Sequence, residues 1–186
     1  MPKQKQSTQI LLGPVPPALI GCGNGKEINI ITLAWVGVVN SSPPMITAAV
    51  RPNRHSYQII KDSGEFTVNM PGKNHVDVAD GCGTLSGQDV NKFEHFNLTA
   101  VKGTLKQAPM IEECPISMEC RIEHIVELDS HTVFIAEVVS SYVESANLDD
   151  KGRIDFEKCN LLGFCAGSYL ETSPLGLSIG YTKKNN

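Results

Sequence analysis

Residues 28–57 read INIITLAWVGVVNSSPPMITAAVRPNRHSY, and this stretch decides the fold. Its apolar and β-branched residues predict a strand over 27–38, which a Ser-Ser-Pro-Pro turn at 41–44 ends. A second strand is predicted over 45–51, and a helix with a positively charged start follows over 54–62, with Asn53 as its N-cap. The stretch therefore places a flat strand beside a cationic helix start, which suits a flat ligand that carries a phosphate.

Upstream, Asn24-Gly25 lies between two apolar runs and predicts a hairpin of strands over 17–23 and 27–38. The neighbouring glycines, in GCGNGK at 21–26, match neither the phosphate loop of NTPases nor the dinucleotide fingerprint. We therefore interpret these glycines as part of a hairpin.

Downstream, alternating or apolar runs predict strands over 65–70, 116–128 and 132–143, and a last strand or covering segment over 161–170. A short helix is expected over 75–80, ended by Gly81, with a loop over 82–94 and a polar loop over 147–153. The run 132–143 is apolar on both faces, which predicts a barrel interior on one side and a subunit partner on the other. Strands dominate and do not alternate with long helices, so the fold class is mainly β, an antiparallel β-barrel with a few short helices.

Length and composition are those of one globular domain. The chain has 186 residues, 41% of them hydrophobic and 19% charged, and we expect residues 10–186 to form the domain behind a flexible tail of residues 1–9. A net charge of −4 predicts no binding to nucleic acid or to an anionic membrane. The polar first nine residues lack the apolar core of a signal peptide, so a cytoplasmic protein is expected.

Six cysteines occur without metal-ligand spacing. None forms a C-x-x-C pair, so the sequence predicts no metal site and favours reduced, buried thiols over a redox role. The cysteines are Cys22, Cys82, Cys114, Cys120, Cys159 and Cys165.

Three groups of residues are candidates for a binding site. The first surrounds the helix start, where free N–H groups, the helix dipole and guanidinium groups favour a phosphate. It comprises Arg51, Arg54, His55 and Ser56; composition alone gives equal weight to a solvated helix start with surface arginines.

The second group lies along the first long strand. An extended strand can offer its backbone N–H and C=O groups to the edge of a heteroaromatic ligand ring, and the single tryptophan offers a flat apolar surface beside it. It comprises Asn29, Ile30, Thr32, Leu33, Ala34 and Trp35. Spacing alone favours a core position for Trp35.

The third group is Ser86, Gly87 and Lys92 in the loop SGQDVNKF. A heteroaromatic ring that gains negative charge on reduction needs a donor or positive charge nearby, and Lys92 is the candidate for tuning such a ring. Without further support, a surface loop with a solvated lysine is the favoured interpretation.

Four motifs in this order resemble the flavin-reductase-like, FMN-binding split-barrel family, and within it the flavoredoxin group. They are NIITLAWVGVVNSSPPMITAAVRPNRHSYQII at 29–60, EFTVNM at 65–70, SGQDVNKF at 86–93 and GSYLETSPLGLSIGY at 167–181. The resemblance covers roughly residues 10–182 and implies a homodimeric antiparallel split barrel with one FMN per subunit near the dimer interface.

The resemblance also implies roles for the candidate residues. The segment 29–35 would lie along the isoalloxazine and ribityl chain, 51–56 would take the phosphate, and the loop with Ser86, Gly87 and Lys92 would close over the flavin, with Phe164 near the ring. Electrons would come from NADH or NADPH, or pass between redox partner proteins. Three functions follow: reduction of flavin or a small acceptor by a reduced nicotinamide, electron transfer between redox proteins without turnover, and non-catalytic FMN binding.

Overall fold

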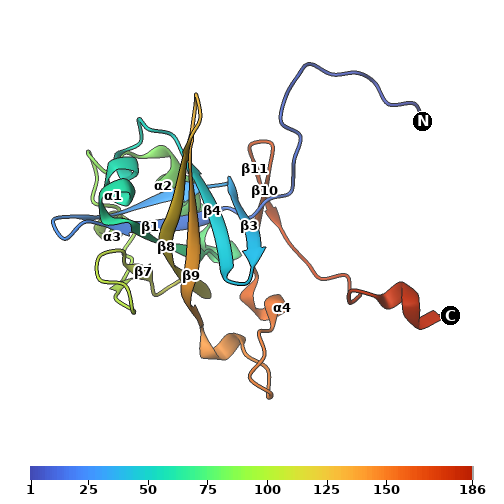
Figure 1. Cartoon of the computed structure of the whole chain (residues 1–186). Coiled ribbons are helices and arrows are strands. Elements are labelled where there is room, and N and C mark those ends of the chain that lie inside the picture. Colours follow the sequence, from blue (N-terminus) through green and yellow to red (C-terminus); the bar gives the residue numbers. More distant parts are fainter. Residues whose placement is uncertain (186) are drawn as a thin grey trace.

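The segment 28–41 supplies both edges of one seven-stranded antiparallel sheet. In the computed structural model, which describes residues 1–185, the strand order is β2-β1-β5-β8-β9-β4-β3. The edge strands β2 and β3 are joined by Ala34 and Trp35, and the Trp35 carbonyl accepts a 3.0 Å hydrogen bond from the Ala49 N–H. A sheet whose two edges are joined by two residues has to coil on itself, so it forms a split barrel (Figure 1).

The other elements cover this barrel or extend from it. The barrel strands are β1 (Ala18–Gly23), β2 (Ile28–Leu33), β3 (Val36–Ser41), β4 (Pro44–Val50), β5 (Glu65–Met70), β8 (Ile116–Glu127) and β9 (Thr132–Val143). Two smaller sheets pair β6 (Ala100–Val101) with β7 (Met110–Ile111) and β10 (Leu162–Cys165) with β11 (Ser168–Glu171). The helices are α1 (His55–Ser63), η1 (Lys73–His75), α2 (Val76–Thr84), α3 (Lys92–His95), η2 (Ser145–Asn147), α4 (Phe156–Cys159) and η3 (Tyr181–Asn185). The mainly β, antiparallel class predicted from the sequence is confirmed.

The single strand predicted over 27–38 is wrong, because two strands occupy this stretch. Ala34 and Trp35 carry the chain from one edge of the sheet to the other. The Trp35 side chain is 48% exposed and its ring lies on that of His131, with centroids 4.4 Å apart, so the core position favoured by spacing is also wrong. The apolar pattern continues through the break because β2 is covered on both faces, and such a pattern does not show where a strand ends.

Two hydrophobic cores enclose β2. Inside the barrel, Ile31 belongs to a cluster with Phe134 and with Ile60 of α1. On the outer face, Ile30 packs in a second cluster with Phe93 of α3. Successive residues of β2 therefore point alternately into the barrel and toward the α2–α3 layer. This packing fixes the strand that carries most of the second group of candidate residues.

Two helix boundaries differ from the predictions. α1 has Arg54 at its N-cap instead of Asn53. α2 continues through Gly81 to Thr84, although Gly81 was predicted to end it. A Cβ at Gly81 would lie 2.1 Å from the ring of Phe96, so this glycine allows close packing inside the helix and does not end it.

The segment 161–170, predicted as a last strand or a covering segment, is a hairpin of two strands. β10 and β11 pair with Phe164 opposite Tyr169, and the two rings meet edge to face with centroids 5.3 Å apart. The backbone of Phe164 also exchanges two 2.8 Å hydrogen bonds with Val15. The hairpin thus holds the chain at Val15, just before β1 begins.

A strap of residues 102–109 crosses the outer side of β1. A Cβ at Gly21 would lie 2.2 Å from the carbonyl oxygen of Pro109, and one at Gly23 would lie 2.2 Å from that of Gln107. The glycines of the GCGNGK stretch therefore permit the strap to approach the strand.

Two carboxylates of the sheet hold this strap. Glu119 of β8 is fully buried and accepts hydrogen bonds from the N–H groups of Thr104, at 2.9 Å, and Leu105, at 2.7 Å. Glu65 of β5 accepts from two further strap N–H groups, at 2.5 and 3.0 Å. Because both anchors bind the backbone, the strap's lysine side chains are left exposed.

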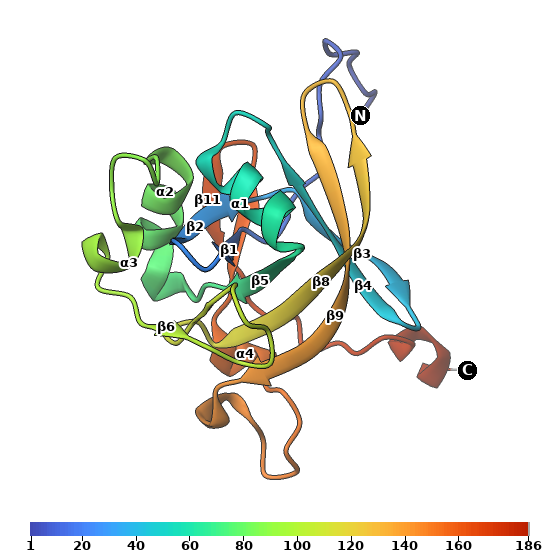
Figure 2. The same ribbon diagram turned by 60° about the vertical axis from the view of Figure 1, so that its left-hand side comes forward.

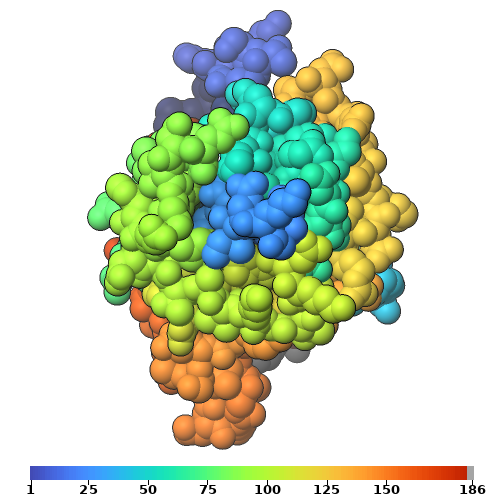
Figure 3. Space-filling view, turned by 90° about the vertical axis from the view of Figure 1, so that its left-hand side faces the viewer, coloured from blue at the N-terminus to red at the C-terminus, as the bar shows by residue number. Residues whose placement is uncertain are grey.

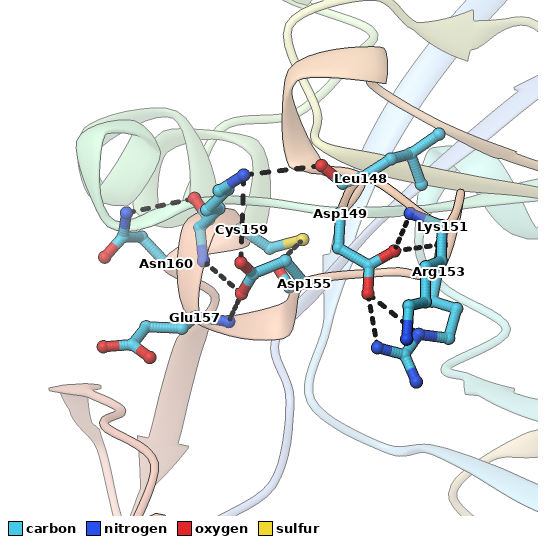
Figure 4. Close-up of polar contacts among 9 residues, drawn as sticks. Leu148, Asp149, Lys151, Arg153, Asp155, Glu157, Cys159 and Asn160 are labelled. Carbon is cyan, nitrogen blue, oxygen red and sulfur yellow. Dashed lines mark hydrogen bonds and ion pairs between the residues drawn. The ribbon is translucent and has the colours of Figure 1, made fainter.

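Between β9 and β10 the chain makes an excursion over residues 144–160 (Figure 2). Figure 4 shows the two carboxylates that organise it. Asp149 accepts from the N–H groups of Lys151, at 2.8 Å, and Arg153, at 2.9 Å, and its carboxylate lies 2.7 Å from the Arg153 guanidinium. Asp155 caps α4 by accepting from two of its first N–H groups.

Both terminal segments run away from the barrel on the side of β3 (Figure 1). The N-terminal segment carries exposed Ile10 and Leu12, and the C-terminal segment carries exposed Leu175 and Ile179. Among residues 1–185, no helix has the length and apolar character needed to cross a membrane.

Candidate functional site

A small cavity lies where the start of α1 meets β2 and the segment 83–92. Its volume is about 180 Å³, whereas pockets for whole ligands begin at about 300 Å³, so it suits one end of a larger ligand. It is lined by Asn29, Ile31, Asn53, Arg54, His55, Ser56, Gly83, Leu85, Ser86, Gly87 and Lys92. The fold thereby brings together predicted site residues from all three candidate groups.

The first turn of α1 makes this cavity favourable for an anion. No side chain caps the helix start, and its first turn contains no acidic residue. The free N–H groups and the helix dipole therefore act on the cavity together with the guanidinium of Arg54. His55 Nε2 lies 2.9 Å from the Glu27 carboxylate, which orients the imidazole. None of the described residues that line the cavity is a carboxylate.

Asn29 joins β2 to the helix start. Its side chain is buried, and the amide nitrogen donates a 2.9 Å hydrogen bond to Ser56 Oγ. Gly87 lies directly against this amide, because a Cβ there would be 2.5 Å from the Asn29 side-chain atoms. Gly87 of the third candidate group is thus in contact with Asn29 of the second group, and this close approach requires a residue without a side chain.

Lys92 places a buried cation beside the cavity. Its side chain is 3% exposed, and Nζ donates to the carbonyls of Ile30, at 2.7 Å, and Cys82, at 2.8 Å. Burial lowers the pKa of Lys92, and Arg54 nearby lowers it further. Burial also raises the pKa of Cys22 to about 12 and that of Cys82 to about 11, so neither thiol supplies a negative charge. In the described structure no carboxylate pairs with this ammonium, which favours an anionic ligand.

Farther along β2, Thr32 has an unpaired polar group. Its Oγ1 is buried and has no hydrogen-bond partner among residues 1–185. Gly83 of α2 lies against it, since a Cβ there would be 3.3 Å from the Thr32 Cβ. Buried hydroxyls are almost always hydrogen-bonded. An unpaired hydroxyl on a strand that carries candidate binding residues therefore indicates that a ligand supplies its hydrogen-bond partner.

The remaining predicted residues do not line this cavity. Ile30 contributes its carbonyl to Lys92 and its side chain to the outer core. Arg51 is exposed and lies before the helix start. The others are Leu33, Ala34 and Trp35, at the crossover between β2 and β3, and Phe164, on the β10–β11 hairpin.

Four cavity residues were not among the candidates named from the sequence: Ile31 and Asn53, which lie inside the segments 29–35 and 51–56, and Gly83 and Leu85, which lie outside every candidate group. Asn53 by itself was interpreted as a helix cap, and only the family resemblance included it in the phosphate segment 51–56. Gly83 was hidden because the predicted helix ended before it, whereas α2 continues and brings it against β2. Only Ile31 had a signal, since it lies two residues from Asn29 on the same strand.

The pattern of the family described as "Flavin reductase like domain" matches residues 13–172. Flavoredoxin from Methanosarcina acetivorans is 30% identical, with a TM-score of 0.92 covering 100% of this chain and 99% of that chain. Flavoredoxin of Desulfovibrio vulgaris (Miyazaki F) is 29% identical, with a TM-score of 0.91 covering 97% and 99%. The FMN reductase (NADH) RutF of Cronobacter sakazakii is 23% identical over 127 residues, which are 68% of this chain and 72% of that protein.

The residues present fit FMN. The cavity at α1 supplies cationic groups and free N–H groups for a phosphate, and the unpaired Thr32 hydroxyl lies farther along the same strand. Gly83 and Gly87 have no side chain, so the segment 83–92 packs directly against Thr32 and Asn29 of β2. The chain belongs to the flavin reductase-like family, and FMN is the cofactor that these residues fit.

Proposed function

We propose that this chain is an FMN-dependent oxidoreductase that oxidises a reduced nicotinamide, NADH or NADPH, and reduces free flavin or a small acceptor. The observation that carries the proposal is the cationic cavity at the start of α1, which is also lined by Asn29 and Ile31 of β2. The name of the RutF relative, an FMN reductase that uses NADH, supports the nicotinamide donor. When bound, FMN supplies the chemistry that accepts a hydride and returns two electrons to an acceptor.

The chain's own residues bind and orient. Arg54, Ser56 and the N–H groups of α1 would hold the phosphate, and Asn29 positions Ser56 through its 2.9 Å hydrogen bond. The Thr32 hydroxyl and the β2 backbone would hold the rest of the flavin.

The charge of Lys92 belongs to the same proposal. Its side chain lines the cavity that also contains Ser56, and that cavity is too small for the tricyclic ring. We therefore assign the ammonium chiefly to the phosphate end of the flavin, with any effect on the ring exerted through space.

A homodimer is the second part of the proposal. On the edge strand β3, Val38 is 83% exposed and Val39 is 54% exposed. An apolar edge strand without a partner is prone to association, and the apolar terminal segments leave the barrel on the same side (Figure 1). A second copy that covers β3 accounts for both features. A cytoplasmic location fits the six free thiols.

An electron carrier between redox proteins is the second candidate function. It is favoured by the similarity to two flavoredoxins over almost the whole chain. In that case the donor and acceptor are proteins that meet the flavin edge, and no nicotinamide is oxidised.

Anaerobic mixing of the FMN-loaded protein with NADH or NADPH tests the proposal. A reductase bleaches the flavin absorbance within seconds, and added free flavin is then reduced in multiple turnovers. Bleaching only by a reduced partner protein favours the carrier. A protein that cannot be loaded with FMN contradicts both.

A further inference from the structure

A larger groove adjoins the cavity at the start of α1. Its volume is about 550 Å³, and it lies between the tip of the β1–β2 hairpin, the segment 87–91 and the strap. Asn29 and Gly87 line both the groove and the cavity, so the two share a wall. Figure 3 shows the hairpin tip in blue, with the green segment beside it and the yellow-green strap below.

The order of these features along one strand decides what can reach the groove. The groove lies at residues 25–29, the cavity at Asn29 and Ile31, and the crossover to β3 at Ala34 and Trp35. If the flavin phosphate occupies the cavity and the ring lies toward the crossover, the groove is on the far side of the phosphate. A ligand that continues beyond its first phosphate therefore enters it.

The groove carries excess positive charge at fixed positions. Lys26 lies on the hairpin tip, and Lys102 and Lys106 lie on the strap. In the described part of the chain, none of the three forms an ion pair. Of the two carboxylates in the lining, Glu27 is engaged by His55 at 2.9 Å, which leaves Asp89.

The strap that presents two of these lysines is held to the sheet by hydrogen bonds. Its backbone is bonded to Glu119 and Glu65, and the glycines of β1 admit it at close range. The lysines are therefore not on a loose loop. Amide side chains beside them, Gln88, Asn91 and Gln107, can bond to hydroxyl groups and ring nitrogens.

We propose that this groove binds the adenosine phosphate portion of a dinucleotide, with the lysines of the strap on its second phosphate. The proposal rests on the proposed function, because it takes the cavity as the site of the flavin phosphate. Two ligands carry this chemistry: FAD, whose adenylate half continues from the flavin phosphate, and NADPH or NADH, whose adenylate half would lie beside bound FMN.

The test uses the full chain with both strap lysines neutralised, Lys102→Gln with Lys106→Gln. Both side chains are exposed and make no hydrogen bond in the described structure, so the substitutions leave the fold intact, which circular dichroism checks. Lys151→Gln is the matched control, an exposed lysine on the excursion of Figure 4. Flavin fluorescence gives the affinities for FMN and FAD, and anaerobic reduction of the FMN-loaded protein gives the KM for NADPH and NADH.

Removing the two charges is expected to weaken the binding of one dinucleotide roughly tenfold, because each exposed ion pair contributes little. The affinity for FMN should stay unchanged. The loss should disappear in high salt. Weaker binding of FAD with an unchanged KM for NADPH and NADH identifies the adenylate half of FAD as the occupant of the groove. A raised KM with unchanged FAD affinity identifies the nicotinamide dinucleotide.

Two results overturn the inference. If FMN, FAD and the nicotinamide dinucleotides are all unaffected, the lysines bind none of them. If FMN is weakened as much as FAD, the groove belongs to the first phosphate and no second site exists. Failure of the native chain to bind FMN contradicts the proposed function instead, and the affinity of the double variant for NADPH then decides the groove by itself.

Discussion

Two arginines on either side of Pro52 and Asn53 have the same chemistry and different positions. Arg54 lines the cavity at the start of α1, whereas Arg51 is exposed and does not reach it. We expect Arg54→Ala to weaken FMN about 10- to 100-fold, since a charge-assisted hydrogen bond contributes about 1.5–3 kcal/mol. Riboflavin, which lacks the phosphate, should bind almost unchanged. Fluorescence titration with both ligands measures the difference.

Arg51→Ala is the matched control for this prediction. Sequence reasoning assigns both arginines the same role, but because Arg51 does not line the cavity we expect Arg51→Ala to leave the affinity for FMN nearly unchanged. Equal losses for FMN and riboflavin in the Arg54 variant would place the phosphate elsewhere.

Lys92 allows a second prediction about a single residue. In Lys92→Met the buried charge disappears, so FMN should stabilise the variant less than it stabilises the native protein. Thermal unfolding with and without FMN measures this. The flavin midpoint potential should fall only slightly, because the ammonium lies at the phosphate end. A large fall with unchanged FMN affinity would assign Lys92 to the ring instead, as the sequence predicts.

At the scale of elements, local patterns predicted most strands, and contacts distant in sequence decided the rest. β5 and β9 have the predicted boundaries, because alternation and turn residues mark their ends. The break at Ala34 and Trp35 and the continuation of α2 through Gly81 depend on closure of the sheet and on Phe96. Neither the closure of the sheet nor the packing of Phe96 on Gly81 can be recognised from the local periodicity of apolar residues.

The same limit applies to the site. The helix start was recognisable from its residues, since basic side chains and a hydroxyl at an N-terminus favour phosphate. The contact of Gly87 with Asn29 joins residues far apart in the chain, and the sequence placed them together only through the family resemblance. The groove beside the strap had no signal, because the anchoring role of Glu65 and Glu119 appears only when β5 and β8 are paired.

The strap gives a prediction for an element. In Glu119→Gln, an amide nitrogen replaces one carboxylate oxygen that accepts from a backbone N–H, which leaves a buried donor facing a donor. We expect a loss of about 1–3 kcal/mol in the free energy of unfolding. This corresponds to a fall in Tm of roughly 2–10 °C for a domain of this size.

Glu123→Gln on the exposed half of the same strand is the control, and it should leave Tm almost unchanged. Both variants are compared by calorimetry. Equal Tm values for the two variants would mean that the strap is not held by Glu119.

At the scale of the whole molecule, the exposed faces of β8, β9 and β3 favour a partner subunit. The first half of β8 is buried, but its second half and much of β9 are only partly covered, although the apolar pattern of β9 predicts cover on both faces. A groove of about 440 Å³, lined by Val38, Met45, Met118 and Val138 among others, runs beside the edge strand β3. Within one chain these surfaces are open, and a second copy would bury them.

Val38→Lys tests this dimer. The side chain is 83% exposed in the single chain, so a lysine there causes no strain in a monomer, but in a dimer it would place an unpaired charge in an apolar interface. We expect the native protein to sediment at twice its 20.2 kDa and the variant to sediment as a monomer. Ile154→Lys, at an exposed apolar residue of the excursion, should remain a dimer. If the interface also completes the flavin site, the monomer binds FMN more weakly than the control does. A native chain that sediments as a monomer with full FMN affinity would show that the split barrel holds its cofactor alone.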